Sequence, residues 1–130
     1  MNTDSTYEVV SSQVFRFEYY YLLKNGTLSA TPWFSTPNFS AMQDVAAIVV
    51  VIAVIDSKSK VLLTDAQMAT LAGTLIDYGG SAAAGCPTPN WQTPGELRRQ
   101  WQCVLDGTNG LPRSAISGIR LYERYFYMSQ

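Results

Sequence analysis

The sequence contains no histidine and only two cysteines among its 130 residues. Histidine is the commonest general base and the commonest metal ligand, so its absence excludes most catalytic triads and most zinc sites. Cys86 and Cys103 are too few for a structural zinc site and are not spaced as a CxxC redox pair. We therefore expect no catalytic residue, no metal site and no cofactor in this chain.

Charge is also scarce. Charged residues make up 15% of the chain, hydrophobic residues 47%, and the net charge is -1. This composition is too apolar for a disordered protein, and it lacks the basic excess that nucleic-acid binding requires. A nucleic acid is therefore not an expected partner.

The chain has no apolar run long enough to cross a membrane. Its longest run, Val45–Ile55, is well short of the roughly 20 residues that a bilayer requires. The first six residues are polar with no apolar core behind them, so no signal peptide is predicted. Such a start fits either a cytoplasmic protein or the soluble part of a longer, exported one.

Val45–Ile55 is predicted to be the central strand of a sheet. Most of its residues are Val or Ile, whose branching at Cβ restricts χ1 in a helix and suits a strand. A continuous apolar run, rather than an alternating one, predicts burial on both faces. We expect a helix to cover one side of it; a buried helix is the alternative interpretation.

Residues 14–23 are predicted to form a half-buried strand, rich in aromatic and branched side chains. A period of two separates its faces, with Arg16, Glu18 and Tyr20 on one and Phe15, Phe17, Tyr19, Tyr21 and Leu23 on the other.

A hairpin is expected directly after this strand. Asn25-Gly26 favours a type I′ turn, in which both central residues need positive φ. Residues 27–34 should return as the antiparallel partner, and Pro32 marks an edge strand or its end. Residues 35–44 are interpreted as a loop with Pro37 and Asn38 as breakers.

Two capping boxes predict two helices. The first has Thr64 as N-cap and Gln67 three residues later, and should end at Gly79-Gly80. The second runs from Thr93 to Glu96 with Pro94 at the first helical position, after a Pro-rich loop over 81–92. The apolar faces follow helical spacing: Met68, Leu71, Ala72, Leu75 and Ile76 on the first, and Leu97, Trp101, Val104 and Leu105 on the second. Residues 106–110 should stop the second helix.

Residues 119–128 should form the last strand. Strands and helices in separate blocks predict an α+β fold, with a mostly antiparallel sheet of about four strands and helices on one face. The length fits a single domain over 1–130, with a flexible or helical lead-in at 1–13 and a folded part at 14–128. The predicted hydrophobic centre consists of Val49, Val51, Ile52, Leu71, Leu75 and Trp101.

The polar residues form no recognisable catalytic pattern. Five aspartates stand near the ends of elements, where capping or solvation explains each of them: Asp44, Asp56, Asp65, Asp77 and Asp106. Residues 106–110 carry oxygen ligands and glycines but lack the spacing and closing glutamate of an EF-hand, so a turn is expected there. Arg98 and Arg99 should face solvent, and the tyrosines should serve sheet packing rather than stacking on bases.

Three segments together resemble a known family. Residues 47–56, 71–75 and 119–127 are similar to the C-terminal region of PilW/PulJ-type minor pilins, and residues 14–18 are similar to the strand with which that region begins. The resemblance spans residues 14–128. Its motifs are structural, not catalytic.

The resemblance implies a non-enzymatic head that helps to assemble the tip of a type IV pilus or a type II secretion pseudopilus. Its expected partners are other minor pilins or pseudopilins. Its location would be the periplasm or cell surface, with anchorage in the inner membrane before assembly through an N-terminal helix. This sequence shows no leader, cleavage site or membrane helix, so the resemblance implies a soluble head without its stem. A cytoplasmic interaction or chaperone-like domain, and a small enzyme using carboxylates alone, are the alternatives.

Cys86 and Cys103 are either two reduced thiols or one disulfide. Cys86 lies in the Pro-rich loop, and Cys103 lies on the following helix, away from its apolar stripe. A loop folded back over its own helix could join them, with a stabilisation of roughly 3 kcal/mol. A periplasmic head permits this bond, whereas a cytoplasmic domain does not.

Overall fold

A computed structural model describes residues 13–34, 43–108 and 110–128 of the chain. The predicted loop at 35–44 falls largely outside these residues, as does nearly all of the lead-in at 1–13. The elements are β1 (Val14–Leu23), β2 (Leu28–Ser29), β3 (Val45–Ile55), α2 (Ser57–Lys60), α3 (Asp65–Thr74), α4 (Glu96–Gly107), α5 (Arg113–Ile116) and β4 (Ile119–Tyr127).

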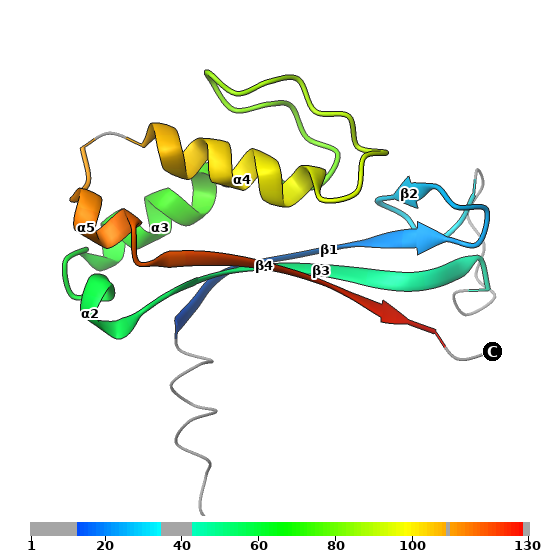
Figure 1. Cartoon of the computed structure of the whole chain (residues 1–130), viewed down its shortest axis with the longest axis horizontal. Coiled ribbons are helices and arrows are strands. Elements are labelled where there is room, and N and C mark those ends of the chain that lie inside the picture. Colours follow the sequence, from blue (N-terminus) through cyan, green and yellow to red (C-terminus); the bar gives the residue numbers. More distant parts are fainter. Residues whose placement is uncertain (1–12, 35–42, 109, 129–130) are drawn as a thin grey trace, which may run out of the picture.

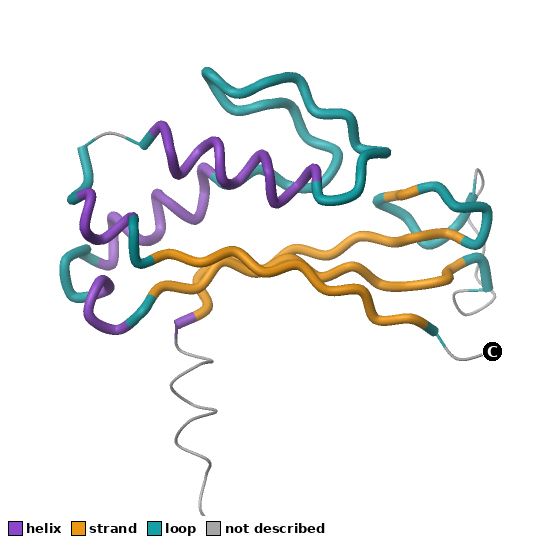
Figure 2. The backbone as a smooth tube through the Cα atoms, in the orientation of Figure 1, coloured by secondary structure: helices purple, strands orange, loops and turns teal. Residues whose placement is uncertain are grey.

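The described strands form one antiparallel sheet in the order β2-β1-β3-β4. The helices α3 and α4 lie above one face of this sheet, and α2 and α5 lie at one end of it (Figure 1). Figure 2 shows the same two layers, with the long strands side by side beneath the helices. The predicted α+β fold, with a mostly antiparallel sheet and helices on one face, is confirmed.

The predicted central strand is confirmed as β3, but its predicted burial on both faces is wrong. Its residues alternate along the whole strand between buried and half-buried. Val49 and Val51 face the helices and are fully buried, whereas Ile52 lies on the other face and is only partly covered. Ile52 is therefore not part of the hydrophobic centre, because no described helix packs on its side of the sheet.

The two faces of β1 lie opposite to what polarity alone would suggest. Glu18 and Tyr20 pair with Val51 and Val49 of β3, so their side chains share the face that the helices cover. Phe17 and Tyr19 point to the uncovered face and are about half exposed. A register shift between Val14 and Arg16 interrupts the period of two at the start of the strand.

The predicted hairpin after β1 is present, but its turn is not type I′. The amide of Gly26 donates to the carbonyl of Leu23, so Lys24 and Asn25 are the central residues of the turn. Gly26 follows with φ of 88°, and the amide of Leu23 closes the loop on Thr27. This is a three-residue loop with glycine in the left-handed position.

The returning strand is much shorter than the predicted 27–34. Only Leu28 and Ser29 pair with β1. The other hydrogen-bonding groups of Leu28 are taken by the Gln92 side chain, which both accepts from its amide and donates to its carbonyl. A side chain thus stands where the next strand would be.

The first capping box is confirmed at Thr64 and Gln67, which begin α3. The helix ends at Thr74, however, and not at Gly79-Gly80 as predicted. Leu75 has extended backbone geometry. Its carbonyl accepts hydrogen bonds from Arg16 of β1, so a strand side chain replaces the helical partner of that carbonyl. Leu75 is still buried.

The second capping box is wrong. The N-cap of α4 is Gly95, which has φ of 81° and makes no side-chain capping bond. The Glu96 carboxylate does not return to Thr93; it is buried and accepts hydrogen bonds from Arg99 and Gln100 instead. A residue in the left-handed region cannot be the helical N2 position that the capping box requires.

The hydrophobic centre otherwise agrees with prediction. Val49, Val51, Leu71, Leu75 and Trp101 are all in one buried cluster. Trp101 is fully buried and donates from its indole Nε1 to the carbonyl of Ile76, which fixes α4 over the segment that follows α3. None of the helices within the described ranges is long and apolar enough to span a membrane.

Candidate interaction surface

The face of the sheet away from the helices is built from three rows of paired residues. Facing residues on neighbouring strands project to the same side. The rows are Phe17–Ile52–Tyr122, Tyr19–Val50–Arg124 and Tyr21–Ile48–Phe126, each running across β1, β3 and β4. Eight of these nine side chains are aliphatic or aromatic. We refer to these nine residues as the open face.

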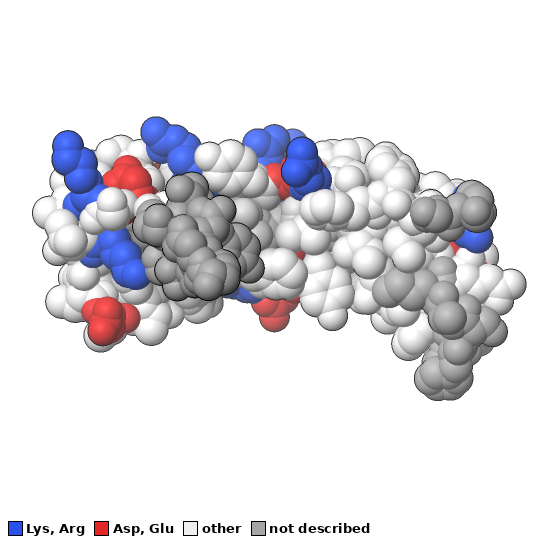
Figure 3. All heavy atoms as spheres, turned by 90° about the horizontal axis from the view of Figure 1, so that it is seen from below, with Lys and Arg blue, Asp and Glu red and all other residues white. Residues whose placement is uncertain are grey.

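The open face leaves large aromatic groups in contact with solvent. Phe17 is 53% exposed, Tyr19 48%, Tyr122 54% and Phe126 50%. The view from below shows mainly uncharged side chains to the right of the centre of the molecule (Figure 3). A cluster of this kind on a soluble domain is typical of a surface that another chain covers.

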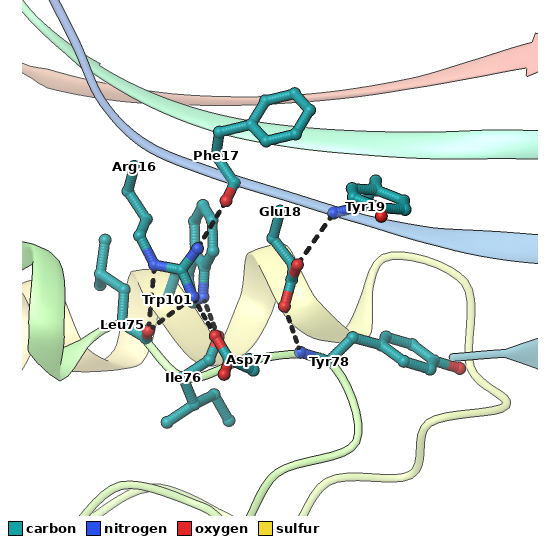
Figure 4. A network of polar contacts seen from close by, with 9 residues as sticks. All are labelled: Arg16, Phe17, Glu18, Tyr19, Leu75, Ile76, Asp77, Tyr78 and Trp101. Atoms are coloured by element: carbon teal, nitrogen blue, oxygen red, sulfur yellow. Dashed lines mark hydrogen bonds and ion pairs between the residues drawn. The ribbon is translucent and has the colours of Figure 1, made fainter. Parts of the chain in front are cut away.

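The opposite face is closed by polar contacts as well as by packing. Arg16 lies over the Trp101 ring, with its guanidinium carbon 5.1 Å from the ring centroid, and it pairs with Asp77. Glu18 accepts from the backbone amide of Tyr78 at 3.0 Å. These contacts come from one side of β1 and hold the segment after α3 against the sheet (Figure 4).

Two stacked tyrosines extend this closed side. The rings of Tyr20 and Tyr78 are 4.1 Å apart and nearly parallel, and the Tyr20 hydroxyl donates to Glu123 at 3.1 Å. Burial, followed by the nearby Glu123 carboxylate, raises the pKa of Tyr20 above its ordinary value. Burial also raises the pKa of Tyr78 to about 12. Both hydroxyl groups are un-ionised at neutral pH, and their contacts stabilise the fold.

The two cysteines are joined. Cys86 and Cys103 form a disulfide with their Cα atoms 6.0 Å apart, which ties the loop before α4 to the helix itself. The Gln100 side chain adds a second tie, because its amide donates to the carbonyl of Pro87. The loop is thus fixed to α4 at two neighbouring points.

The five aspartates named from the sequence lie at different places in the fold. Asp56 caps α2 and accepts from the amide of Ser59, and this bond lowers the pKa of its carboxyl. Asp77 pairs with Arg16, and Asp106 accepts from Gln102. Asp65 lies in the first turn of α3, and Asp44 accepts from the amide of Phe34. Within the described residues no three His, Cys, Asp or Glu side chains are placed to hold a metal ion.

No family model matches the chain, and neither a curated protein nor a solved structure matches it. The open face must therefore be interpreted on its own geometry. Sequence reasoning found its aromatic residues but assigned Ile52 to the core and did not single out Ile48 or Val50. The signal was present, since a strand that is apolar on both faces needs a cover on each.

Proposed function

We propose that this chain is the non-catalytic head of a minor pilin or pseudopilin, acting in assembly of the tip of a type IV pilus or a type II secretion pseudopilus. The observation that carries the proposal is the open face. It supplies a wide apolar surface on a rigid sheet, and a filament subunit needs such a surface for its neighbours.

The composition of β3 supports the proposal that a second element packs on the open face. A continuous apolar run is typical of a strand that is buried on both faces. The helices α3 and α4 cover the face of Val49 and Val51, whereas Val50 and Ile52 remain partly exposed. A helix from an adjacent subunit would complete the burial that the sequence of β3 is suited to.

The size of the open face fits a protein interface. Four aromatic side chains are about half exposed. A fully buried Phe or Tyr removes about 150–250 Å² from water, so these four offer roughly 400 Å² of further burial. That is about half of the roughly 800 Å² that one partner contributes to a standard interface, before Ile48, Val50 and Ile52 are counted.

The disulfide supports an oxidising location. Such bonds persist in the periplasm and are rare in the cytosol. The location that follows from the proposal is the periplasm or cell surface, with other minor pilins or pseudopilins as partners.

The test is co-purification with the pilins encoded beside this chain. Tyr122→Ser combined with Phe126→Ser removes two exposed rings from the open face and should abolish capture while the protein stays folded. Val61→Ser combined with Leu62→Ser is the matched control, because these exposed apolar residues follow α2 and lie outside the open face. Capture that is equal for both double variants, or robust turnover of a small substrate by the wild type, would contradict the proposal.

A further inference from the structure

A second surface lies on the helical side of the sheet, along its β4 edge. A hollow of about 990 Å³ opens between α4, α5 and the beginning of β4. Four arginines line it: Arg98, Arg99, Arg113 and Arg120. Apolar side chains also line it, namely Leu105, Ile116, Ile119 and Leu121. We refer to this hollow as the arginine trough.

The trough concentrates positive charge in a chain that has little charge of either sign. It holds four of the nine Lys and Arg residues, although the net charge is -1. Asp106 is the single carboxylate that lines it, and Asp106 accepts from the neutral Gln102. Arg99 is paired with Glu96, but within the described residues no ion pair is formed by Arg98, Arg113 or Arg120.

Two of these arginines are held in place by backbone carbonyls. Arg113 donates to the carbonyls of Leu105 and Asp106 at 3.4 and 3.5 Å. Arg120 donates to the carbonyls of Ser117 and Ile119 at 2.7 and 3.1 Å. A guanidinium has five N–H donors, so each retains donors that can bind a carboxylate, often in a two-pronged geometry.

The trough adjoins the free edge of the sheet. β4 is the terminal strand of the sheet order, and no other described strand pairs with its outer side. Ile119, Arg120 and Leu121 belong both to β4 and to the trough lining. Figure 1 shows β4 running along the border of the sheet beneath α4, with α5 at the point where the strand begins. An edge strand presents unpaired backbone groups with which an extended peptide can pair.

We propose that the arginine trough and the β4 edge together bind an extended acidic peptide segment of a partner protein. The segment would add a strand to β4, and its side chains would alternate between the two sides of the sheet. Every second side chain would enter the trough, where a carboxylate would meet Arg98 or Arg113. The intervening side chains would extend the open face beside Tyr122 and Phe126, so they should be apolar. This inference rests on the trough and the β4 edge, and it does not depend on filament membership.

The alternation gives the proposal a sharp test. The probe is a fluorescent peptide of about ten residues, long enough to match a strand of this length, in which Glu and Val alternate. Fluorescence anisotropy should show saturable binding to the full chain. A peptide of the same composition with all Glu residues in one block should bind at least about tenfold more weakly, because a slip in alternation sends carboxylates to the wrong side.

Charge reversal identifies the trough. Arg98→Glu combined with Arg113→Glu should weaken binding of the alternating peptide by about tenfold or more, since two charge-assisted contacts become repulsive. Arg124→Glu is the matched control, because Arg124 lies on the open face and does not line the trough; it should change the affinity by less than about threefold. If the double Glu variant does not fold, Arg98→Gln with Arg113→Gln tests the same contacts.

Hydrogen exchange locates the peptide. On binding, amides of β4 should become protected, because strand addition pairs its outer groups. Equal affinity for the alternating and block peptides would mean that the arginines attract acidic peptides by charge alone and that no strand is added to β4. Full displacement of the peptide by an equal concentration of citrate would make it a site for small anions. Either result, or the absence of saturable binding, would overturn the proposal.

Discussion

Removing the disulfide by replacing Cys86 and Cys103 together with serine should destabilise the fold markedly. The two residues are 17 positions apart. For a closed loop of this size, the loss of chain entropy in the unfolded state corresponds to about 3 kcal/mol of stabilisation. A domain of this size is stable by only about 5–15 kcal/mol, so the loss would be a large share of the total.

Urea unfolding followed by tryptophan fluorescence measures this directly. With an m-value of about 1–3 kcal/mol/M, the midpoint should fall by about 1–3 M in the double serine variant. A reducing agent should lower the midpoint of the wild type to a similar value and leave the variant unchanged, which separates the bond from the substitutions.

The result also bears on location. Mass spectrometry of unreduced protein purified under air should show no alkylatable thiol. Two free thiols in that sample, or a loss of stability below about 0.5 kcal/mol, the size of an ordinary surface substitution, would refute the reasoning.

Three further perturbations test the fold. Leu75→Ala should cost about 2–5 kcal/mol in urea unfolding, since it opens a cavity between the sheet and the helices; a cost under half a kcal/mol would mean that this side chain is not in the core. Gly118→Ala should cost about 1–3 kcal/mol of stability, because an added Cβ would lie 1.9 Å from the Ser59 hydroxyl oxygen. Gly73→Ala is the control: an added Cβ there would meet nothing within 4 Å, so the substitution should be neutral or stabilising. Equal effects of the two substitutions would contradict the packing of α2. The free energy of unfolding should fall as pH rises from about 10 towards 12. Tyrosines of the unfolded chain ionise in this range, whereas burial keeps Tyr20 and Tyr78 protonated in the folded state. Unfolding measured at each pH tests this, and a free energy that stays constant over the range would contradict their burial.

The strands and the fold class could be predicted because their signals are local. Branched residues in Val45–Ile55 and the turn residues after β1 are sufficient to place a central strand and a hairpin. The capping box at Thr64 is equally local and marks the start of α3 correctly. The capping box predicted at Thr93 is wrong because Gly95 has left-handed backbone geometry, which the capping-box pattern does not take into account.

The orientation of β1 could not be predicted, because its polar residues find partners far along the chain. Arg16 lies against the segment around Leu75 and Asp77, some 60 residues away. Glu18 meets the amide of Tyr78 at a similar separation. Polarity would send such residues outward, but long-range hydrogen bonds and the Trp101 ring make the inner face favourable for them.

The open face was found only in part, and the arginine trough was missed, for a related reason. The sequence indicates that both faces of Val45–Ile55 are apolar. It does not indicate which face is covered by helices of the same chain and which by a partner chain. Arg98 and Arg113 appear in the sequence as ordinary exposed charges. Only the packing of α4 and α5 beside β4 gathers them with Arg120 around one hollow.

Site-specific photo-crosslinking in the producing cell tests most directly whether the open face is covered by another subunit. A photoreactive residue replaces Tyr19, in the middle row of the open face, or Val61, which is 81% exposed outside it. We expect a crosslink from position 19 to a partner subunit, and none from position 61. Crosslinks from position 61 alone, with position 19 unreacted, would contradict it.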